Sequence, residues 1–335
     1  MDSDTGQSLT IEGIGQHIAG LATELQSRPT QSGFFRIRTA NRCLEDAKTM
    51  PIPDRLFHSL IFEGELTILV ADTNVGKSIF ATQIGDHIAR NGRKVLYVDL
   101  ELSDKQFERR YSKDFTNHHR FHPDLLRADF TARFHIPDGV SYDDYFIESL
   151  INSVEQSSAK VVIIDNMTRL ISTDTDSAKS AKPLMDRLNQ LKADYGLTLL
   201  LLEHTKKTDN SRPISLNDLQ GSKMKANFAD AVFTIGRSEK DKALRYIKQL
   251  KVRSCEFEYD VDNVIVYEIA KEVNNLNFSF AGYGSEWEHL QRPSENDRDE
   301  MINRAKELKA QGMSNRAIAK ELEMSEGWVR KWLKR

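Results

Sequence analysis

Apolar runs and helical patterns alternate along the middle of the chain. Five runs of mainly apolar residues have the length of buried strands, at residues 66–70, 94–100, 160–165, 197–203 and 231–236. Between them, apolar residues recur every three or four positions, as on a helix face, at residues 76–91, 142–156 and 181–195. Buried strands that alternate with helices predict an α/β fold with a mainly parallel sheet flanked by helices.

Two further runs come after these strands in the sequence, and their pattern of polar and apolar residues is different. Residues 245–252 and 263–269 alternate polar with apolar side chains. This alternation is typical of antiparallel strands with one solvated face. We therefore expect an antiparallel edge on the parallel sheet.

The two ends of the chain are more polar. Near the N-terminus, apolar spacing predicts a helix within 11–25, a linker at 27–33 and a second short helix at 39–50 that ends before Pro51. Near the C-terminus, a linker at 292–297 precedes a pattern of three short helices. The predicted organisation is a helical N-terminal segment (1–50), a large α/β core (51–288) and a small helical domain (293–335).

Composition narrows the class of protein. The chain has 335 residues, of which 39% are hydrophobic and 29% charged, with a net charge of −3. It can therefore bury a large core, and any nucleic-acid footprint must be local. Its two cysteines, Cys43 and Cys255, exclude a disulfide scaffold and a four-cysteine zinc site. Without a signal-peptide pattern or a run of about 18 apolar residues, we expect a cytoplasmic protein with no membrane span.

A phosphate-binding loop follows the strand at 66–70. Eight residues match the P-loop pattern, with Ala in place of the usual first Gly: Ala71, Asp72, Thr73, Asn74, Val75, Gly76, Lys77 and Ser78. Gly76 lets backbone N–H groups close around phosphate, and the helix that begins there, with Ile79 in its first turn, directs its positive end at the anion. Lys77 would reach the β and γ phosphates, and Ser78 would offer its hydroxyl to Mg²⁺. The alternative is a tight turn without a ligand, but the flanking strand and helix favour ATP and Mg²⁺ as ligands.

Two carboxylates complete the predicted chemistry. Asp165 ends the strand at 160–165, where a carboxylate can hold the Mg²⁺ shell. Glu101 follows the strand at 94–100 and is the first choice for polarising the water that attacks the γ phosphate, with Asp99 as the alternative.

At these residues the chain resembles a known family. Leu-Glu-Leu-Ser at 100–103, with the downstream Gln106 and Arg109/Arg110, resembles the DnaB-type replicative helicases. The segment that begins His204-Thr205-Lys206 is similar to plasmid RepA-type hexameric helicases and RadA-like proteins. The resemblance covers about residues 50–270 and implies a RecA-like P-loop core in which His204 senses the γ phosphate.

The resemblance also implies DNA contacts and a ring-shaped homo-oligomer, expected to be a hexamer. Residues 205–221 would form the loop that lines the channel around single-stranded DNA, and its cations are Lys206, Lys207 and Arg212. Lys251 and Arg253 share one face of their strand and would reach the neighbouring subunit's nucleotide, with Lys248 as the alternative member. The alternatives are a mobile surface loop and a solvated basic strand face.

The C-terminal helices resemble a resolvase-type helix-turn-helix that binds duplex DNA. From Met301 onward, nine basic and four acidic side chains give a local charge of +5. Arg330, with residues 325–327, would face the major groove, and the phosphate contacts would come from Lys331, Lys334 and Arg335. The alternative is a small helical module that contacts protein.

These features lead to one main hypothesis: an ATP-hydrolysing DNA motor, a RepA/DnaB-like ring helicase of plasmid or mobile-element replication. The alternative is a DNA-binding ATPase that loads or regulates replication or recombination factors without unwinding. A third class, a DNA-binding regulator with a purely structural P-loop, is disfavoured by the set Lys77, Ser78, Glu101 and Asp165.

Overall fold

The computed structural model describes residues 30–32, 35–131, 134–170, 178–206, 209–219, 223–291, 295–322, 324 and 326–333. The chain divides into two compact units, Met1–Pro53 and Asp54–Arg335. Both cysteines are free thiols. None of the described helices combines the length and the apolar composition needed to cross a bilayer.

The first unit contains a short hairpin and a helix. Strand β1 (Thr30–Ser32) pairs antiparallel with β2 (Phe35–Ile37). The linker expected at 27–33 is therefore wrong for β1, because these residues find backbone partners in β2. Helix α2 (Ala40–Ala47) begins after Thr39, whose hydroxyl accepts the Arg42 N–H at 3.2 Å, so the helix expected at 39–50 is confirmed. The helix expected within 11–25 lies outside the described residues.

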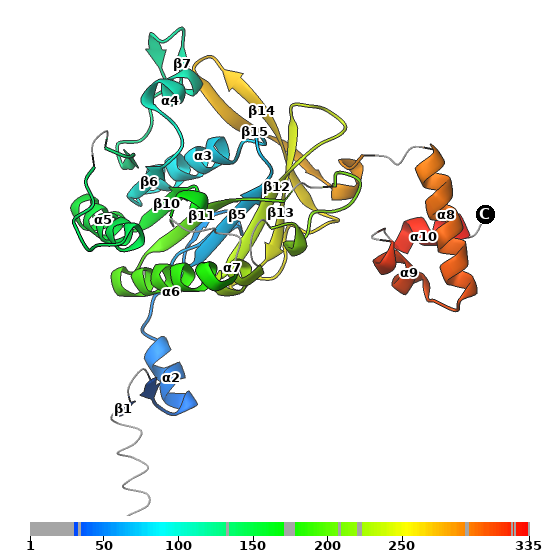
Figure 1. Ribbon diagram of the computed structural model, residues 1–335, viewed down its shortest axis with the longest axis horizontal. Helices are drawn as coiled ribbons and strands as arrows, with labels where there is room; N and C mark the ends of the chain where they lie inside the picture. Colours follow the sequence, from blue (N-terminus) through cyan, green and yellow to red (C-terminus); the bar gives the residue numbers. More distant parts are fainter. Residues whose placement is uncertain are drawn as a thin grey trace, which may run out of the picture. The chain divides into compact units, whose positions relative to one another are not determined.

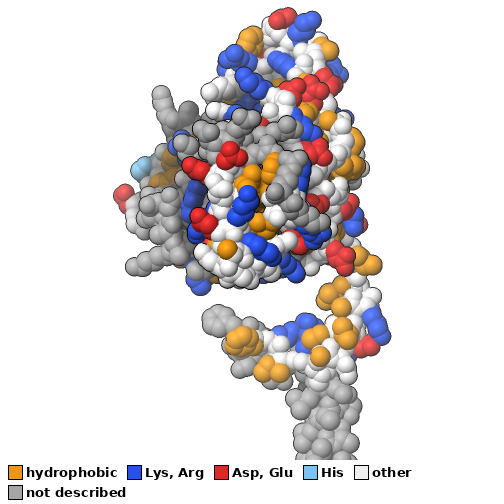
Figure 2. All heavy atoms as spheres, turned by 90° about the vertical axis from the view of Figure 1, so that its right-hand side faces the viewer, with side chains coloured by type: hydrophobic (Ala, Val, Ile, Leu, Met, Phe, Trp, Pro, Cys, Tyr) orange, Lys and Arg blue, Asp and Glu red, His pale blue; other side chains and the backbone are white. Residues whose placement is uncertain are grey.

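Apolar side chains of this unit are exposed. Exposed apolar side chains are drawn in orange in Figure 2. The exposed apolar residues in this unit include Phe35, Ile37, Leu44, Met50 and Ile52.

The second unit is built on a nine-stranded sheet (Figure 1). Its order is β15 (Asn275–Gly284), β14 (Val264–Glu272), β13 (Leu244–Lys251), β12 (Ala231–Arg237), β5 (Leu66–Ala71), β11 (Thr198–His204), β10 (Val161–Asp165), β6 (Val95–Asp99) and β9 (Leu125–Ala128). The strands from β12 to β9 pair in parallel, and β13, β14 and β15 continue the sheet antiparallel. The predicted α/β fold with a mainly parallel sheet and an antiparallel edge is therefore confirmed, whereas β9 and β15 were not predicted.

Helices cover both faces of the sheet (Figure 1). Helix α3 (Lys77–Arg90) packs on one face, where it meets Leu69 and Ala71 of β5. Helices α5 (Tyr142–Ser157), α6 (Ala178–Tyr195) and α7 (Lys223–Phe228) cover the other face, which includes Ile68 and Val70 of the same strand. Successive side chains of β5 therefore point into two separate hydrophobic cores, one on each face of the sheet. Helix α4 (Asp104–Arg110) follows β6.

Smaller elements complete this unit. Strands β3 (Arg55–Phe57) and β4 (Ile61–Phe62) form one hairpin, and β7 (Ser112–Lys113) and β8 (Asn117–His118) form another. Three 3₁₀ turns lie at Met167–Arg169, Leu216–Asp218 and Glu286–Glu288.

The C-terminal segment forms the three expected helices. They are α8 (Glu295–Ala310), α9 (Asn315–Glu321) and α10 (Glu326–Leu333). Their core consists of Ala305, Leu308, Ile318, Ala319 and Val329. Ser314 caps α9 by accepting the Ala317 N–H, as expected, whereas the second predicted cap, Ser325, lies outside the described residues. The boundary at residue 293 stays a prediction.

Candidate functional site

The loop between β5 and α3 has the geometry of an anion site. Gly76 has φ +108°, and a Cβ there would lie 2.8 Å from Ile269 Cδ1 and 2.9 Å from Phe278 Cζ, so only glycine fits. Gly76 is also the N-cap of α3 and supplies no side-chain cap. The first N–H groups of the helix are therefore left for a ligand, and the helix dipole favours an anion there.

Two arginines hold the outer side of this loop. Arg237 of β12 donates to the Thr73 carbonyl at 2.9 Å, and Arg245 of β13 donates to the Val75 carbonyl at 2.9 Å. The two arginines face each other across the β12–β13 pair. These two hydrogen bonds tie the carbonyls of the loop to the neighbouring strands. Neither arginine was singled out from the sequence.

Lys77 and His204 meet at the centre of the site. The buried Lys77 ammonium donates to the carbonyls of Ala71 (2.9 Å) and Asp72 (3.0 Å) and lies 3.1 Å from His204 Nδ1. Burial lowers the pKa of Lys77, while the carboxylates of Asp165 and Glu101 oppose the shift. Burial and the nearby Lys77 lower the pKa of His204. The lowered pKa favours the neutral imidazole, whose Nδ1 can accept a hydrogen bond from the ammonium.

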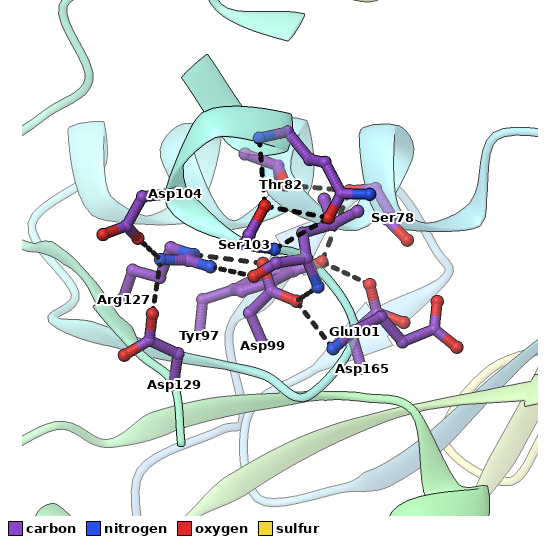
Figure 3. Close-up of polar contacts among 12 residues, drawn as sticks. Ser78, Thr82, Tyr97, Asp99, Glu101, Ser103, Asp104, Arg127, Asp129 and Asp165 are labelled. Carbon is purple, nitrogen blue, oxygen red and sulfur yellow. Dashed lines mark hydrogen bonds and ion pairs between the residues drawn. The ribbon is translucent and has the colours of Figure 1, made fainter. Parts of the chain in front are cut away.

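Asp165 is a buried carboxylate at the tip of β10 (Figure 3). Its Oδ2 accepts the Tyr97 hydroxyl at 2.7 Å, whereas its Oδ1 has no hydrogen-bond partner among the described residues. Burial raises the pKa of Asp165 to about 6, and the hydroxyls of Ser78 and Tyr97 oppose the rise.

Ser78 and Asp165 fit a magnesium site that is completed by phosphate. The described residues contain no cluster of three or more His, Cys, Asp or Glu that could hold a metal alone. Mg²⁺ commonly uses one or two carboxylates together with substrate phosphates. The free Oδ1 of Asp165 and the nearby hydroxyl of Ser78 match that requirement.

The structure separates the roles of Asp99 and Glu101. Asp99 is buried, and its two oxygens accept the N–H groups of Glu101 (3.1 Å) and Leu102 (2.9 Å) and the Arg127 Nε–H (3.0 Å). Glu101 is exposed to the cavity beside the phosphate loop. Asp99 is therefore held by fixed partners, whereas the Glu101 carboxylate faces the place where a nucleotide would lie.

Asn166, which the sequence analysis missed, joins Glu101 to this cluster. Its Oδ1 accepts the Thr168 N–H at 3.0 Å, so its Nδ2 is left to donate to Glu101 Oε1. The same Nδ2 lies 3.4 Å from His204 Nε2. The only sequence signal was its place directly after Asp165.

A cavity of about 600 Å³ opens beside the phosphate loop. Its polar and charged walls come from Lys77, Ser78, Glu101, Arg110 and His204, and its apolar walls from Ile79, Ile269 and Leu276. Ile269 and Leu276 come from the β14–β15 hairpin, whose second strand the sequence did not predict. The cavity therefore combines a phosphate end with an apolar wall large enough for a nucleotide base.

Lys251 and Arg253 lie away from this cavity. Lys251 pairs in register with Val232, near the N-terminal end of β12. The phosphate loop follows the C-terminal end of the parallel neighbour β5, at the other end of the strands. Lys251 donates to the carbonyls of Ala226 and Ala229, both at 2.7 Å, and Arg253 forms an ion pair with Asp230 at 2.9 Å. Neither can therefore reach the site of its own chain.

Lys248, the alternative member of this pair, is not an exposed cation. It is buried, donates to the Ile214 carbonyl at 2.7 Å and forms an ion pair with Glu286. It belongs to the packing of β13.

Within the predicted channel loop, the structure describes residues 205, 206 and 209–219. Arg212 forms an ion pair with Asp218 at 2.5 Å, and the Asp218 carbonyl accepts the Lys206 N–H at 2.8 Å. These contacts hold residues 209–219 around a 3₁₀ turn. The Lys206 side chain is exposed, and Lys207 lies outside the described residues.

A buried ion pair links the end of β11 to α7. Lys225 Nζ lies 2.5 Å from Glu203 Oε2, and each side chain is 1% exposed. The other oxygen of Glu203 accepts the His204 N–H at 3.0 Å. The pair therefore fixes the main chain at His204, and the sequence analysis assigned it no role.

In the C-terminal helices, Arg330 forms an ion pair with Glu326 at 2.9 Å. Lys331 is exposed and lies near the Trp332 ring. Lys334 and Arg335 lie outside the described residues.

This chain is similar to known proteins over part of its length. The AAA domain family matches residues 36–210, which is just over half of the chain. The DNA repair protein RadA of Campylobacter jejuni is 22% identical over 151 residues, or 44% of this chain. The chain spans about a third of that relative's length, since the match covers 30% of it. The solved KaiC-like protein PH0186 of Pyrococcus horikoshii is 18% identical, with a TM-score of 0.47 over 66% of this chain and 94% of that one.

Proposed function

The chain belongs to the AAA domain family, and from this membership we propose that it hydrolyses ATP with Mg²⁺ and uses the energy to act on DNA. One observation carries the proposal. Side chains at the carboxyl ends of four parallel strands come together here: Lys77 after β5, Glu101 after β6 and His204 on β11 line one cavity, and the buried Asp165 of β10 interacts electrostatically with Lys77 and Glu101. Carboxyl ends of parallel strands meet at one edge of a sheet, which is where such sites form.

The residues of this chain have separate tasks in the proposed reaction. The N–H groups at the start of α3 and the Lys77 ammonium bind the phosphates, and Ser78 and Asp165 would hold Mg²⁺. The metal, when bound, neutralises charge on the phosphate oxygens. Glu101 orients and polarises the attacking water, and the Asn166 amide keeps its carboxylate at the cavity. His204, in contact with Lys77, responds to the presence of the terminal phosphate.

Two features support DNA as the partner. The relative from C. jejuni is a DNA repair protein, and the C-terminal helices carry a local excess of positive charge. We propose a ring-shaped oligomer, expected to be a hexamer, in which Lys206 and Lys207 face single-stranded DNA and the C-terminal helices bind duplex. The specific proposal is a RepA/DnaB-like helicase of plasmid or mobile-element replication. The alternative is a DNA-binding ATPase that loads or regulates replication or recombination factors without unwinding.

Hydrolysis tests the core of this proposal. The wild type should release phosphate from ATP in a Mg²⁺-dependent manner, and single-stranded DNA should stimulate it. Lys77→Ala should abolish hydrolysis because it removes a phosphate contact, and Glu101→Gln should keep nucleotide binding but lose turnover. Lys182→Ala and Glu148→Gln, which alter exposed helix positions, should behave as wild type.

The outcomes distinguish the proposed roles of Lys77 and Glu101 and the two proposed DNA functions. Turnover at the wild-type rate in Lys77→Ala would mean that hydrolysis occurs elsewhere. Turnover at the wild-type rate in Glu101→Gln would remove Glu101 from its role. A forked duplex then distinguishes the two DNA functions, because strand separation that depends on Lys77 indicates a helicase and hydrolysis without separation indicates a loader or regulator.

A further inference from the structure

Arg127 of β9 lies beside the turn that carries Glu101 (Figure 3). Its side chain is 19% exposed and uses four of its five N–H donors. Nε donates to Asp99 at 3.0 Å, and Nη2 donates to the Leu102 carbonyl at 2.6 Å. Nη1 donates to Asp104 at 2.7 Å and Asp129 at 3.0 Å. The guanidinium also lies over the Phe107 ring, 5.1 Å from its centroid.

These contacts enclose Glu101 on both sides. Arg127 holds one oxygen of Asp99, and the other oxygen of Asp99 accepts the N–H groups of Glu101 and Leu102. Arg127 also holds the carbonyl of Leu102, the residue after Glu101. The main chain of Glu101 is thus fixed before and after its Cα, although the turn belongs to no helix or strand.

The contacts do not extend to the phosphate-binding side of the cavity. Within the described part of the chain, the partners of Arg127 all lie between residues 99 and 129, outside the loop at 71–79. Nucleotide affinity should therefore depend little on Arg127, whereas the position of Glu101 should depend on it strongly.

We propose that Arg127 is a positioning residue for hydrolysis: by fixing the turn at 99–102, it places the Glu101 carboxylate against the reacting water. This inference rests on the ATPase function proposed above. A carboxylate displaced by about 1 Å can lose roughly 100-fold in rate, so an arginine with no contact to the nucleotide can still control turnover.

The test is a separation of kcat from nucleotide affinity. Arg127→Lys keeps a cation for Asp99, but its single nitrogen cannot hold both Asp99 and the Leu102 carbonyl in the geometry of the guanidinium. We expect kcat to fall roughly 10- to 100-fold, with the Kd for an ATP analogue unchanged. Asp104→Asn and Asp129→Asn remove the negative charge of the outer, more exposed partners and serve as matched controls. They should keep wild-type kcat.

A double variant tests whether the effect passes through Glu101. In single-turnover measurements, Arg127→Lys should add no further loss to Glu101→Gln. An equal additional loss, a wild-type kcat in Arg127→Lys, or a Kd raised as much as kcat falls would each overturn the inference. If Arg127→Lys does not fold, the near-isosteric Asp99→Asn takes its place with the same expected split. A wild type without Lys77-dependent hydrolysis would instead refute the proposed function.

Discussion

Burial disfavours the charged forms of two residues at this site, Asp165 and Lys77. Asp165 is a buried carboxylate with one oxygen unpartnered among the described residues, and Lys77 is a buried ammonium that contacts His204. Such groups lower the stability of the folded chain, yet they are the groups that would meet Mg²⁺ and phosphate. Binding sites commonly sacrifice stability in this way.

Asp165→Asn should therefore stabilise the nucleotide-free protein at alkaline pH. The folded-state pKa of about 6 lies above the ordinary value of 3.8, so the cost of the ionised carboxyl is absent below pH 4 and grows as the pH rises through 6. This rise corresponds to at most roughly 3 kcal/mol. We expect urea unfolding in EDTA to show a gain of about 1–3 kcal/mol at pH 8, which shrinks toward pH 4.5.

The same variant should lose Mg²⁺-dependent hydrolysis, because the amide is a poor replacement for a carboxylate in the metal shell. Asp186→Asn, an exposed position on α6, is the control and should change neither property. If Asp165→Asn proves less stable than the wild type at pH 8, the carboxylate is stabilised by contacts that the structure does not show.

At the scale of elements, strand β13 runs from the phosphate loop toward Lys251 and Arg253. At its start, Arg245 holds the phosphate loop through the Val75 carbonyl. Lys251 is the last residue of β13, and Arg253 follows two residues later, so both lie at the opposite end of the strand from the phosphate loop. A strand of eight residues spans roughly 27 Å, so its far end cannot serve the nucleotide of the same chain. In a ring, that end would be free to face a neighbour.

Mixing two inactive variants tests this arrangement. Arg253→Ala removes the cation, and Lys77→Ala removes the phosphate contact. In a mixed oligomer, some interfaces would combine an intact phosphate loop with an intact Arg253, so hydrolysis should partly recover. The measurement is phosphate release at varied mixing ratios, with subunit exchange shown by fluorescence transfer. No recovery despite exchange would leave Arg253 as the structural partner of Asp230.

The elements also show what the sequence could and could not predict. The core strands could be predicted because their apolar runs are continuous, and Lys77, Ser78 and Asp165 could be proposed as site residues because their signal is local. Strand β9 was missed because Leu-Leu-Arg-Ala is short and contains a charge. The role of Arg127 could not be predicted from the sequence, because it depends on the pairing of β9 with β6, which brings Arg127 to Asp99. Tyr97 likewise becomes informative only through its distant partner, Asp165.

At the scale of the whole molecule, charge is unevenly distributed. The chain carries −3 overall, whereas residues 301–335 carry +5. The nucleotide site belongs to the sheet, and the C-terminal helices have a small core of their own. We therefore expect the two DNA activities to separate when residues 293–335 are removed. ATP hydrolysis and its stimulation by single-stranded DNA should survive, and duplex binding should weaken.

A salt titration of duplex binding makes that expectation quantitative. Each phosphate contact releases about one counterion, so neutralising Lys331, Lys334 and Arg335 should weaken binding to all sequences and flatten the dependence on salt. Arg330 belongs to the same helix but was assigned to a base edge, so Arg330→Ala should cost roughly 1–3 kcal/mol at one base position and leave the slope unchanged. Lys240→Ala, an exposed lysine of the sheet domain, is the control and should change neither affinity nor slope. Full-length and truncated proteins with equal affinities and equal slopes would show that the C-terminal helices contact protein instead of DNA.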